Sequence, residues 1–281
     1  MKIQILIENT TKSDLIPEHG LSFFIEYNDK KILLDAGITS AFINNAKNMG
    51  VDIASADYCV LSHGHYDHSG GFAEYLKQNP TKKVYAMKTI TDDYYSASGG
   101  NIHPIGVPKD VFPAYKANFV LLNNITKLSE GVYVIPHKNT SDLSKIGERA
   151  KLYKKIKDEY VPDDFSHELS LVFDTDGGLV IFNSCSHSGI TNIINEVKDY
   201  FGTDKNIRAF FGGLHMKGKL EDREICTFSE SEIRKTVNHL KDNKVDKLYT
   251  GHCTGIVGYE LIKKYMGDKV EYIHTGKEIV L

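Results

Sequence analysis

The feature that most constrains this chain is a short run of metal-binding residue types, His63-Gly-His65-Tyr-Asp67-His68. It directly follows the apolar stretch 57–61, which predicts a short buried strand. In an extended backbone, residues two apart point to the same side, so we expect His63 and His65 to face one centre. Imidazole and carboxylate groups suit zinc, iron and manganese. The run therefore predicts a metal site at the end of a strand.

A single loop cannot surround two ions, so further ligands must come from other strand ends. Glycines at positions 64, 70 and 71 flank the histidine run and allow the backbone to turn tightly around an ion. Three later strands, expected at 179–182, 207–211 and 247–249, are each followed by a histidine among small residues. These histidines are His187, His215 and His252. Ligand sites of α/β sheets gather at the carboxyl ends of strands, so all three are candidates for the same site.

Composition limits the classes of partner. The 281 residues carry a formal net charge of −3, which disfavours nucleic acid as a partner, because nucleic-acid binders are usually basic. The four cysteines are widely spaced, which favours reduced thiols over a disulfide framework. The chain opens with a strand pattern rather than a signal peptide, and it holds no apolar run of about 18 residues. We expect a cytoplasmic protein with a small-molecule substrate and no membrane association. Homodimerisation is possible for such a chain and is left as an alternative.

The pattern of elements predicts a layered α/β fold. Strands are expected at 3–8, 21–26 and 31–34, followed by alternating strands and helices to about residue 90. A hairpin over 168–182 and three strand–helix steps then follow, so the second half repeats the order of the first, with paired strands before alternating strands and helices. Two sheets packed together with helices outside satisfy such a pattern in one domain spanning 1–281. Residues 90–165 are interpreted as an insertion that caps the site, and 145–159 within it as loosely helical.

His-Gly-His-Tyr-Asp-His-Ser-Gly-Gly resembles the signature loop of the metallo-β-lactamase superfamily. Leu34-Asp35-Ala-Gly37 resembles an early motif of that superfamily, in which the aspartate supports the metal loop, and Tyr249-Thr-Gly-His252 resembles its last ligand motif. The resemblance implies a four-layer αββα sandwich of the metallo-β-lactamase type. Four local features resemble the branch named for dihydropterin-ribofuranosyl-aminobenzene-phosphate synthase. They lie at 18–26, 185–190, 212–215 and 252–255.

The resemblance also implies roles for individual residues. His63 and His65 match ligands of a first metal, Asp67 and His68 match ligands of a second, and His252 matches the late ligand of the second. The superfamily's bridging aspartate after the hairpin is missing, because that position offers Cys185 and His187 instead. We expect His187 to replace it as a ligand. The alternatives for this remaining ligand are His167 and Glu168.

The expected cofactor is a pair of divalent metal ions, with zinc favoured and manganese or iron as alternatives. His65 stands where the flavo-diiron branch uses a carboxylate, which argues against a redox iron pair. The resemblance implies a hydrolase that uses metal-activated water on a small phosphorylated or cyclic-ester metabolite. Asp67 and His215 are the candidate catalytic residues, and His19 is a candidate for substrate contact. The alternatives are the pterin-precursor synthase reaction and a non-catalytic metal-binding or sensor protein.

Overall fold

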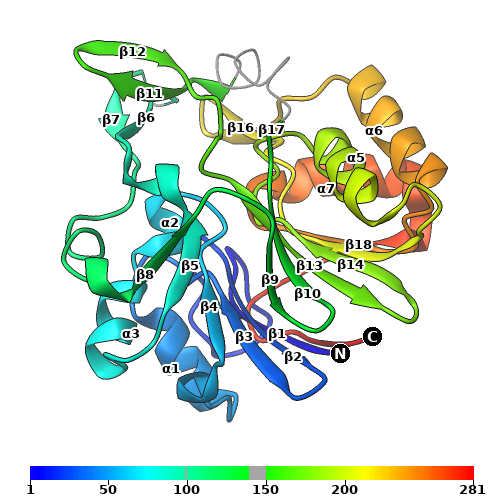
Figure 1. Cartoon of the computed structure of the whole chain (residues 1–281). Coiled ribbons are helices and arrows are strands. Elements are labelled where there is room, and N and C mark those ends of the chain that lie inside the picture. Colours follow the sequence, from blue (N-terminus) through cyan, green and yellow to red (C-terminus); the bar gives the residue numbers. More distant parts are fainter. Residues whose placement is uncertain (99, 139–149) are drawn as a thin grey trace. The chain divides into compact units, whose positions relative to one another are not determined.

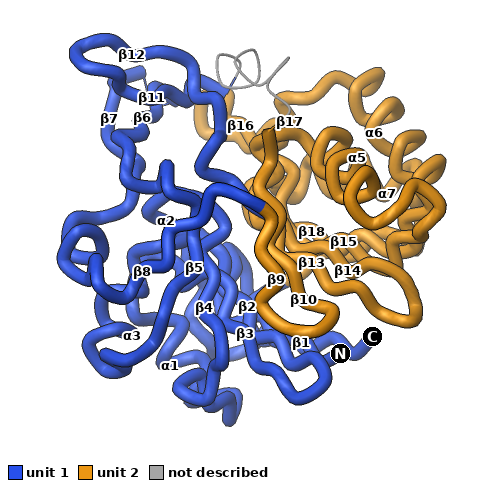
Figure 2. Tube along the Cα trace, viewed as in Figure 1, with its two compact units in different colours: residues 1–124, 140–169, 274–281 blue, residues 125–139, 170–273 orange. Residues whose placement is uncertain are grey.

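The computed structural model describes residues 1–98, 100–138 and 150–281, and the chain divides into two compact units (Figure 2). The first unit consists of residues 1–124, 140–169 and 274–281, and the second of residues 125–139 and 170–273. Each unit contains one large sheet with its own helices (Figure 1). Among the described residues, every helix is too short or too polar to cross a membrane.

The sheet of the first unit has seven strands in the order β20-β1-β2-β3-β4-β5-β8. Strands β20, β1, β2 and β3 pair antiparallel, and β3, β4, β5 and β8 pair parallel. The strands are β1 (Lys2–Ile7), β2 (Ser22–Tyr27), β3 (Lys30–Leu34), β4 (Tyr58–Val60), β5 (Val84–Met87), β8 (Phe119–Leu122) and β20 (Glu278–Val280). The helices are α1 (Ala41–Asn48), α2 (Tyr66–Ser69) and α3 (Phe72–Gln78).

The register of the strands positions residues 62–68, the histidine loop of this unit. Leu34, the last residue of β3, pairs with Val60, the last residue of β4, in a parallel arrangement. The segments that leave the two strands therefore start at the same sheet edge, where polar sites of α/β sheets form. Asp35 begins the first of these segments, and Ser62-His63 lies two residues into the second.

Four short strands drawn from the predicted capping region form a separate small sheet in the order β12-β11-β6-β7. They are β6 (Tyr94–Ser96), β7 (His103–Pro104), β11 (Leu152–Ile156) and β12 (Glu159–Pro162). The expectation of helix over 145–159 is wrong for residues 152–156, which pair with β6 and β12, and residues 145–149 lie outside the described part. That the region 90–165 caps the site stays a prediction, and β8 within it belongs to the large sheet.

The sheet of the second unit also has seven strands, in the order β19-β18-β15-β14-β13-β10-β9. The strands are β9 (Thr126–Ser129), β10 (Val132–Pro136), β13 (Leu169–Thr175), β14 (Gly178–Phe182), β15 (Ile207–Phe211), β18 (Leu248–Thr250) and β19 (Val270–Tyr272). A two-stranded hairpin, β16 (Lys217–Leu220) and β17 (Arg223–Cys226), stands apart from the sheet. The helices are α5 (Ile190–Phe201), α6 (Glu230–Asp242) and α7 (Gly255–Met266).

One apolar core joins these three helices to their sheet. Ile193 of α5, Val237 of α6 and Ile262 of α7 belong to the same buried cluster as Ile181 and Phe210 of the strands. The amphipathic spacing of each helix explains this packing, because residues three or four apart share a face. Figure 1 shows the three helices on the same side of β14 and β18.

Three aromatic rings stack across the ends of neighbouring parallel strands in the second unit. Phe182 and Phe211 end β14 and β15, and their ring centroids lie 4.5 Å apart with an interplanar angle of 8°. Phe211 and Tyr249 of β18 stack in the same way, at 4.5 Å and 12°. The segments that carry His187, His215 and His252 begin directly after these rings. The stack therefore fixes where the three segments leave the sheet.

We expect Phe211→Ala to lower the free energy of unfolding by about 3–5 kcal/mol, because truncating a buried phenylalanine leaves a cavity between two stacked rings. Phe211→Leu keeps part of the volume and should lose less. Urea denaturation followed by circular dichroism measures both. Equal stability of the alanine variant and the unmodified chain would show that the stack does not support these strand ends.

Candidate metal centre

The carboxylate of Asp35 is hydrogen-bonded to the histidine loop of the first unit. Its Oδ1 accepts a hydrogen bond from the backbone N–H of Ser62 at 2.8 Å, and its Oδ2 accepts one from the Ser62 hydroxyl at 2.7 Å. Oδ2 also lies 2.8 Å from Nδ1 of His68. Asp35, Ser62 and His68 are all buried, so these bonds compensate the cost of burying the carboxylate. The contact to Nδ1 leaves Nε2 as the nitrogen with which His68 can bind a metal.

The imidazole rings of the loop converge within the first unit. The ring centroid of His63 lies 4.6 Å from that of His65 and 4.2 Å from that of His68. All three rings are buried. Burial, together with the neighbouring ring of His167, lowers the pKa of His65 to about 3, so its imidazole is neutral at neutral pH. A neutral imidazole is the form that ligates a metal.

Asp67 lies beside the same rings, at the start of α2. Its Oδ2 is 3.6 Å from Nε2 of His68 and 3.4 Å from Nε2 of His19. Asp67 is buried, whereas the side chain of His19 is 52% exposed. His19 thus connects the buried carboxylate with solvent. The structure therefore brings together His63, His65, Asp67 and His68, the four ligand candidates that the sequence predicts in this unit.

Two glycines let α2 and its loop pack against the chain that follows β3. A Cβ added at Gly70 would lie 2.2 Å from the carbonyl oxygen of Ile38, and one at Gly71 would lie 2.1 Å from that of Ala36. Both glycines have helical backbone angles. They are needed for close approach rather than for a left-handed turn, which is a different reason from the one that the sequence suggested.

His167, one of the two alternatives for the remaining ligand, is buried beside the loop. Its Nδ1 accepts a hydrogen bond from the backbone N–H of Gly64 at 3.0 Å, and its Nε2 lies 3.0 Å from Oδ2 of Asp163. The ring of Tyr94 packs on it with centroids 4.0 Å apart. Glu168, the second alternative, is buried next to it in the chain.

The candidates of the second unit follow β14, β15 and β18. His187 and His252 are buried, and His215 is half-buried. The ring centroids of His187 and His215 lie 4.5 Å apart. His252 opens a short 3-10 helix, η4 (His252–Thr254), directly before α7. The second unit thus gathers its own imidazoles at one edge of its sheet.

Two buried thiols accompany these imidazoles. Ligand atoms of Cys185, His252 and Cys253 lie within 4.8 Å of one another. The backbone N–H of His215 donates to Sγ of Cys253 at 3.3 Å. Burial raises the pKa of the Cys253 thiol, but its contacts with Cys185 and His215 outweigh burial and lower this pKa well below its usual value.

A hydrogen-bonded chain that sequence reasoning missed supports the segment after β14. Nδ1 of His137 lies 2.7 Å from a carboxylate oxygen of Glu196, and its Nε2 lies 2.7 Å from Oγ of Ser170. The side-chain amide of Asn183 donates to the same Oγ at 3.0 Å, and its oxygen accepts from the backbone N–H of Ser186 at 2.7 Å. The only sequence signal for this series of hydrogen bonds is the position of Asn183 directly after a strand.

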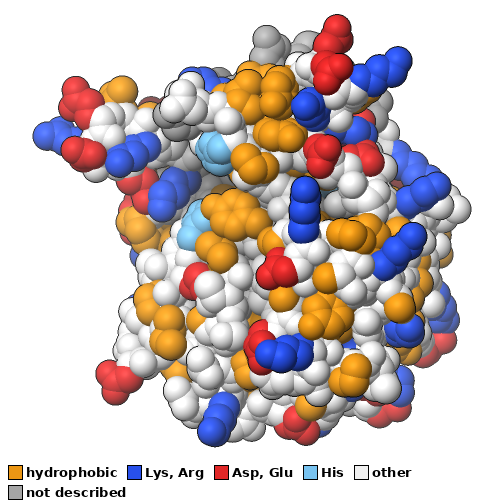
Figure 3. All heavy atoms as spheres, turned by 90° about the vertical axis from the view of Figure 1, so that its left-hand side faces the viewer, with side chains coloured by type: hydrophobic (Ala, Val, Ile, Leu, Met, Phe, Trp, Pro, Cys, Tyr) orange, Lys and Arg blue, Asp and Glu red, His pale blue; other side chains and the backbone are white. Residues whose placement is uncertain are grey.

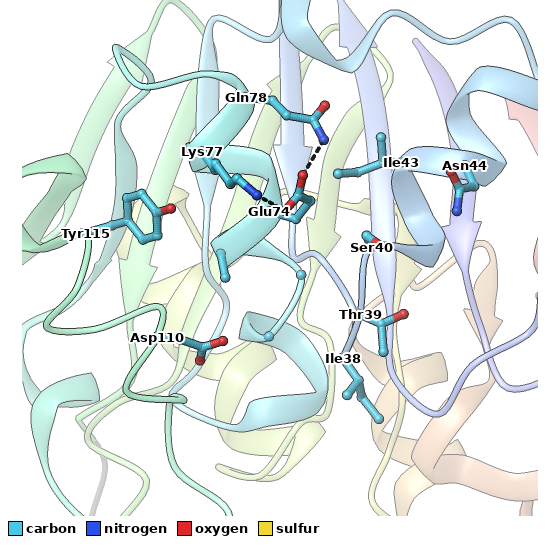
Figure 4. A pocket seen from close by; sticks show the side chains of 13 residues that line it. Ile38, Thr39, Ser40, Ile43, Asn44, Glu74, Lys77, Gln78, Asp110 and Tyr115 are labelled. Atoms are coloured by element: carbon cyan, nitrogen blue, oxygen red, sulfur yellow. Dashed lines mark hydrogen bonds and ion pairs between the residues drawn. The ribbon is translucent and has the colours of Figure 1, made fainter.

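An open groove of about 510 Å³ in the first unit has none of these ligand candidates in its lining (Figure 4). Its lining includes Ser40, Asp110, Tyr115 and Glu74, and Glu74 contacts Lys77 and Gln78 of its own helix. Elsewhere on the surface, Lys and Arg side chains are interspersed with Asp and Glu, as Figure 3 shows for one face.

Comparisons with known proteins show which family this chain resembles. A family model described as the metallo-beta-lactamase superfamily matches residues 15–142. The chain is 30% identical over 284 residues to an uncharacterized protein of Methanocaldococcus jannaschii, with 99% of each chain covered. It is 28% identical over 297 residues to a second protein of that archaeon, named 7,8-dihydropterin-6-methyl-4-(beta-D-ribofuranosyl)-aminobenzene-5'-phosphate synthase, with 99% of this chain and 96% of the relative covered.

A solved structure, described as Tm1679, a metal-dependent hydrolase of the beta-lactamase superfamily, matches with a TM-score of 0.82. The match covers 100% of this chain and 99% of the other, at 24% identity. This likeness confirms the fold class that the sequence predicts.

We expect Asp35→Ala to lower the free energy of unfolding by about 3–5 kcal/mol, because three buried donors lose their acceptor at once. Urea denaturation of the metal-free protein measures this loss. The matched control is Asp29→Ala in an exposed turn, which should change stability by less than about 0.5 kcal/mol. Similar stabilities for the two variants would contradict the supporting role of Asp35.

Proposed function

Because the chain belongs to the metallo-β-lactamase superfamily, we propose that it is a metal-dependent hydrolase that uses two divalent ions to cleave a small phosphorylated or cyclic-ester metabolite with water. The observation that carries this proposal is the convergence of three buried imidazoles and the carboxylate of Asp67 in the first unit. Imidazole and carboxylate donors suit zinc, and also manganese or iron.

The residues of the first unit fit a metal ion in a second respect. A ligating histidine commonly bonds a carboxylate through its other ring nitrogen, which fixes the tautomer and the direction of the ring. Asp35 stands in this relation to His68. In the proposed site, His63 and His65 hold the first ion, and Asp67 and His68 hold the second. His187 and His252 complete the two sets.

A bound divalent ion supplies acidity, since it lowers the pKa of water toward 7. The side chains of the chain orient the reactants around it. Asp67 accepts a hydrogen bond from the attacking water and directs it toward the substrate. His19, whose Nε2 faces the Asp67 carboxylate from the surface, exchanges a proton with solvent. His215, whose half-buried ring lies next to His187, is the proposed substrate contact.

A second candidate function is synthesis of the pterin precursor. The similarity to the synthase of Methanocaldococcus jannaschii extends over nearly the whole of both chains and favours this candidate. The same metal-ligand set would serve it. Formation of the compound named in that relative, rather than cleavage of esters, distinguishes the two candidates. A third candidate, a metal sensor, would retain the ligands without any turnover.

We expect the metal-free protein to take up about two zinc ions per chain. His68→Ala and His252→Ala should each lower this number, because each removes a proposed ligand of the second ion. His239→Ala is the control, since His239 lies on α6 and contacts Asn243 rather than the proposed ligands. Metal content measured by mass spectrometry after gel filtration tests this. Full zinc content in both ligand variants would refute the proposed assignment.

We expect the zinc-loaded protein to hydrolyse a chromogenic phosphodiester or a lactone, and Asp67→Asn to lower kcat by about 10²–10⁴-fold, as loss of a proton-handling group does. Steady-state rates over a panel of phosphodiesters, lactones and carboxylic esters give the measurement. Asp29→Asn, in an exposed turn, should retain the full rate. Two bound ions without turnover of any of these classes would contradict the hydrolase proposal and leave the synthase and the sensor as the candidates.

A further inference from the structure

The hydrogen bonds of His167 define the protonation of its ring. A backbone N–H always donates, so Nδ1 of His167 must accept from Gly64 and carry no proton. The proton of the neutral ring then sits on Nε2, which donates to Oδ2 of Asp163 at 3.0 Å. Both ring nitrogens are thereby used within the first unit.

Asp163 is itself fixed on both sides. Its Oδ1 accepts from the backbone N–H of Phe165 at 2.8 Å, and its own N–H donates to the carbonyl oxygen of Leu152 at 3.0 Å. Asp163 and His167 are fully buried, and the ring of Tyr94 packs on the imidazole. The pair thus links the small sheet β12-β11-β6-β7, through Leu152 of β11, to the peptide of Gly64.

We propose that His167 and Asp163 are positioning residues of the histidine loop, and that His167 is not a metal ligand. Gly64 separates His63 from His65, so a fixed acceptor for its N–H sets the direction in which the two flanking imidazoles point. This inference rests on the proposed function only in assuming that those imidazoles bind a metal ion.

A different reading would make His65, Asp163 and His167 a metal site of their own, because their ligand atoms lie within 4.8 Å of one another. An ion bound there through His167 would have to displace the proton shared with Asp163 or the bond from Gly64. Displacing the second would leave a buried backbone N–H without an acceptor, which is costly. The geometry therefore favours the positioning role.

Nuclear magnetic resonance of the unmodified chain with ¹⁵N-labelled histidine tests this assignment without any change in folding. We expect His167, identified by the signal that His167→Gln removes, to show an unprotonated Nδ1 and a protonated Nε2 in the metal-free protein. The same pattern should persist after loading with a spin-active cadmium isotope, and the His167 nitrogens should show no coupling to cadmium. A cadmium coupling at His167, or a proton on Nδ1, would overturn the proposal.

Asp163→Asn tests the positioning effect, because an amide has one oxygen and cannot accept from both Phe165 and His167. Either the N–H of Phe165 or the Nε2–H of His167 then faces the N–H₂ group of the new side chain. Alternatively, the His167 proton moves to Nδ1, where it faces the N–H of Gly64. We expect zinc affinity, measured by competition with a chromogenic chelator, to fall by about 10–100-fold. The matched control is Asp164→Asn, which keeps the oxygen that accepts from the backbone of Ser166 and should retain affinity.

The outcomes separate this inference from the proposed function. Unchanged zinc affinity in a folded Asp163→Asn variant, shown folded by circular dichroism, would refute the positioning role while leaving the hydrolase proposal intact. Failure of the unmodified chain to bind zinc or cadmium would refute the hydrolase proposal, and with it the positioning role. Should the Asp163→Asn variant fail to fold, the resonance experiment on the unmodified chain still decides whether His167 is a ligand.

Discussion

The arrangement of the candidate ligands in the first unit depends on the buried carboxylate of Asp35. A carboxylate with no exposed surface is costly to hold in a protein interior unless hydrogen bonds replace its hydration. Asp35 meets this requirement with the N–H and hydroxyl of Ser62 and with Nδ1 of His68. These donors belong to the segment that follows β4 and to α2, so the charge can be satisfied only when this segment and the helix are both in place. Formation of the sheet and formation of the ligand set are therefore one event.

In the second unit, packing of apolar side chains positions the segments that carry the candidate ligands. Its three candidate segments leave neighbouring parallel strands, and the stacked rings of Phe182, Phe211 and Tyr249 hold the strand ends together. The chain from His137 through Ser170 to Asn183 then fixes the first of these segments by hydrogen bonds. Support of this kind would lower the entropic cost of binding an ion at the proposed ligands, because their segments are already held in place.

The sequence predicts those parts of the fold and site whose signal is local. The strands expected at 179–182 and 207–211 agree closely with β14 and β15. The ligand candidates His63, His65, Asp67 and His68 lie next to each other in the chain. The strand β11 was missed because residues 152–154 pair with β6, more than fifty positions earlier, and strand preference depends on such partners. Ser170 escaped notice for the same reason, since His137 lies 33 positions earlier in the chain. Asp163 lies only four positions before His167, but its role depends on the bond that His167 accepts from Gly64 in the folded chain.

Backbone conformation adds a cost that no residue pattern reveals. Asp35, Ser186, His215 and His252 all adopt left-handed φ angles between 48° and 59°, and each lies in a segment that carries or supports a candidate ligand. Non-glycine residues in this region are strained by about 1–2 kcal/mol each, so the surrounding structure must hold them there. Glycine would relieve the strain at Asp35, His215 and His252 but would remove the carboxylate or the imidazole there. Turn residues such as Asn28 and Lys244 share this conformation, so the strain alone does not mark a site. At Asp35, His215 and His252 it coincides with a side chain that carries or supports a candidate ligand, which is the balance expected where a local backbone preference yields to a site.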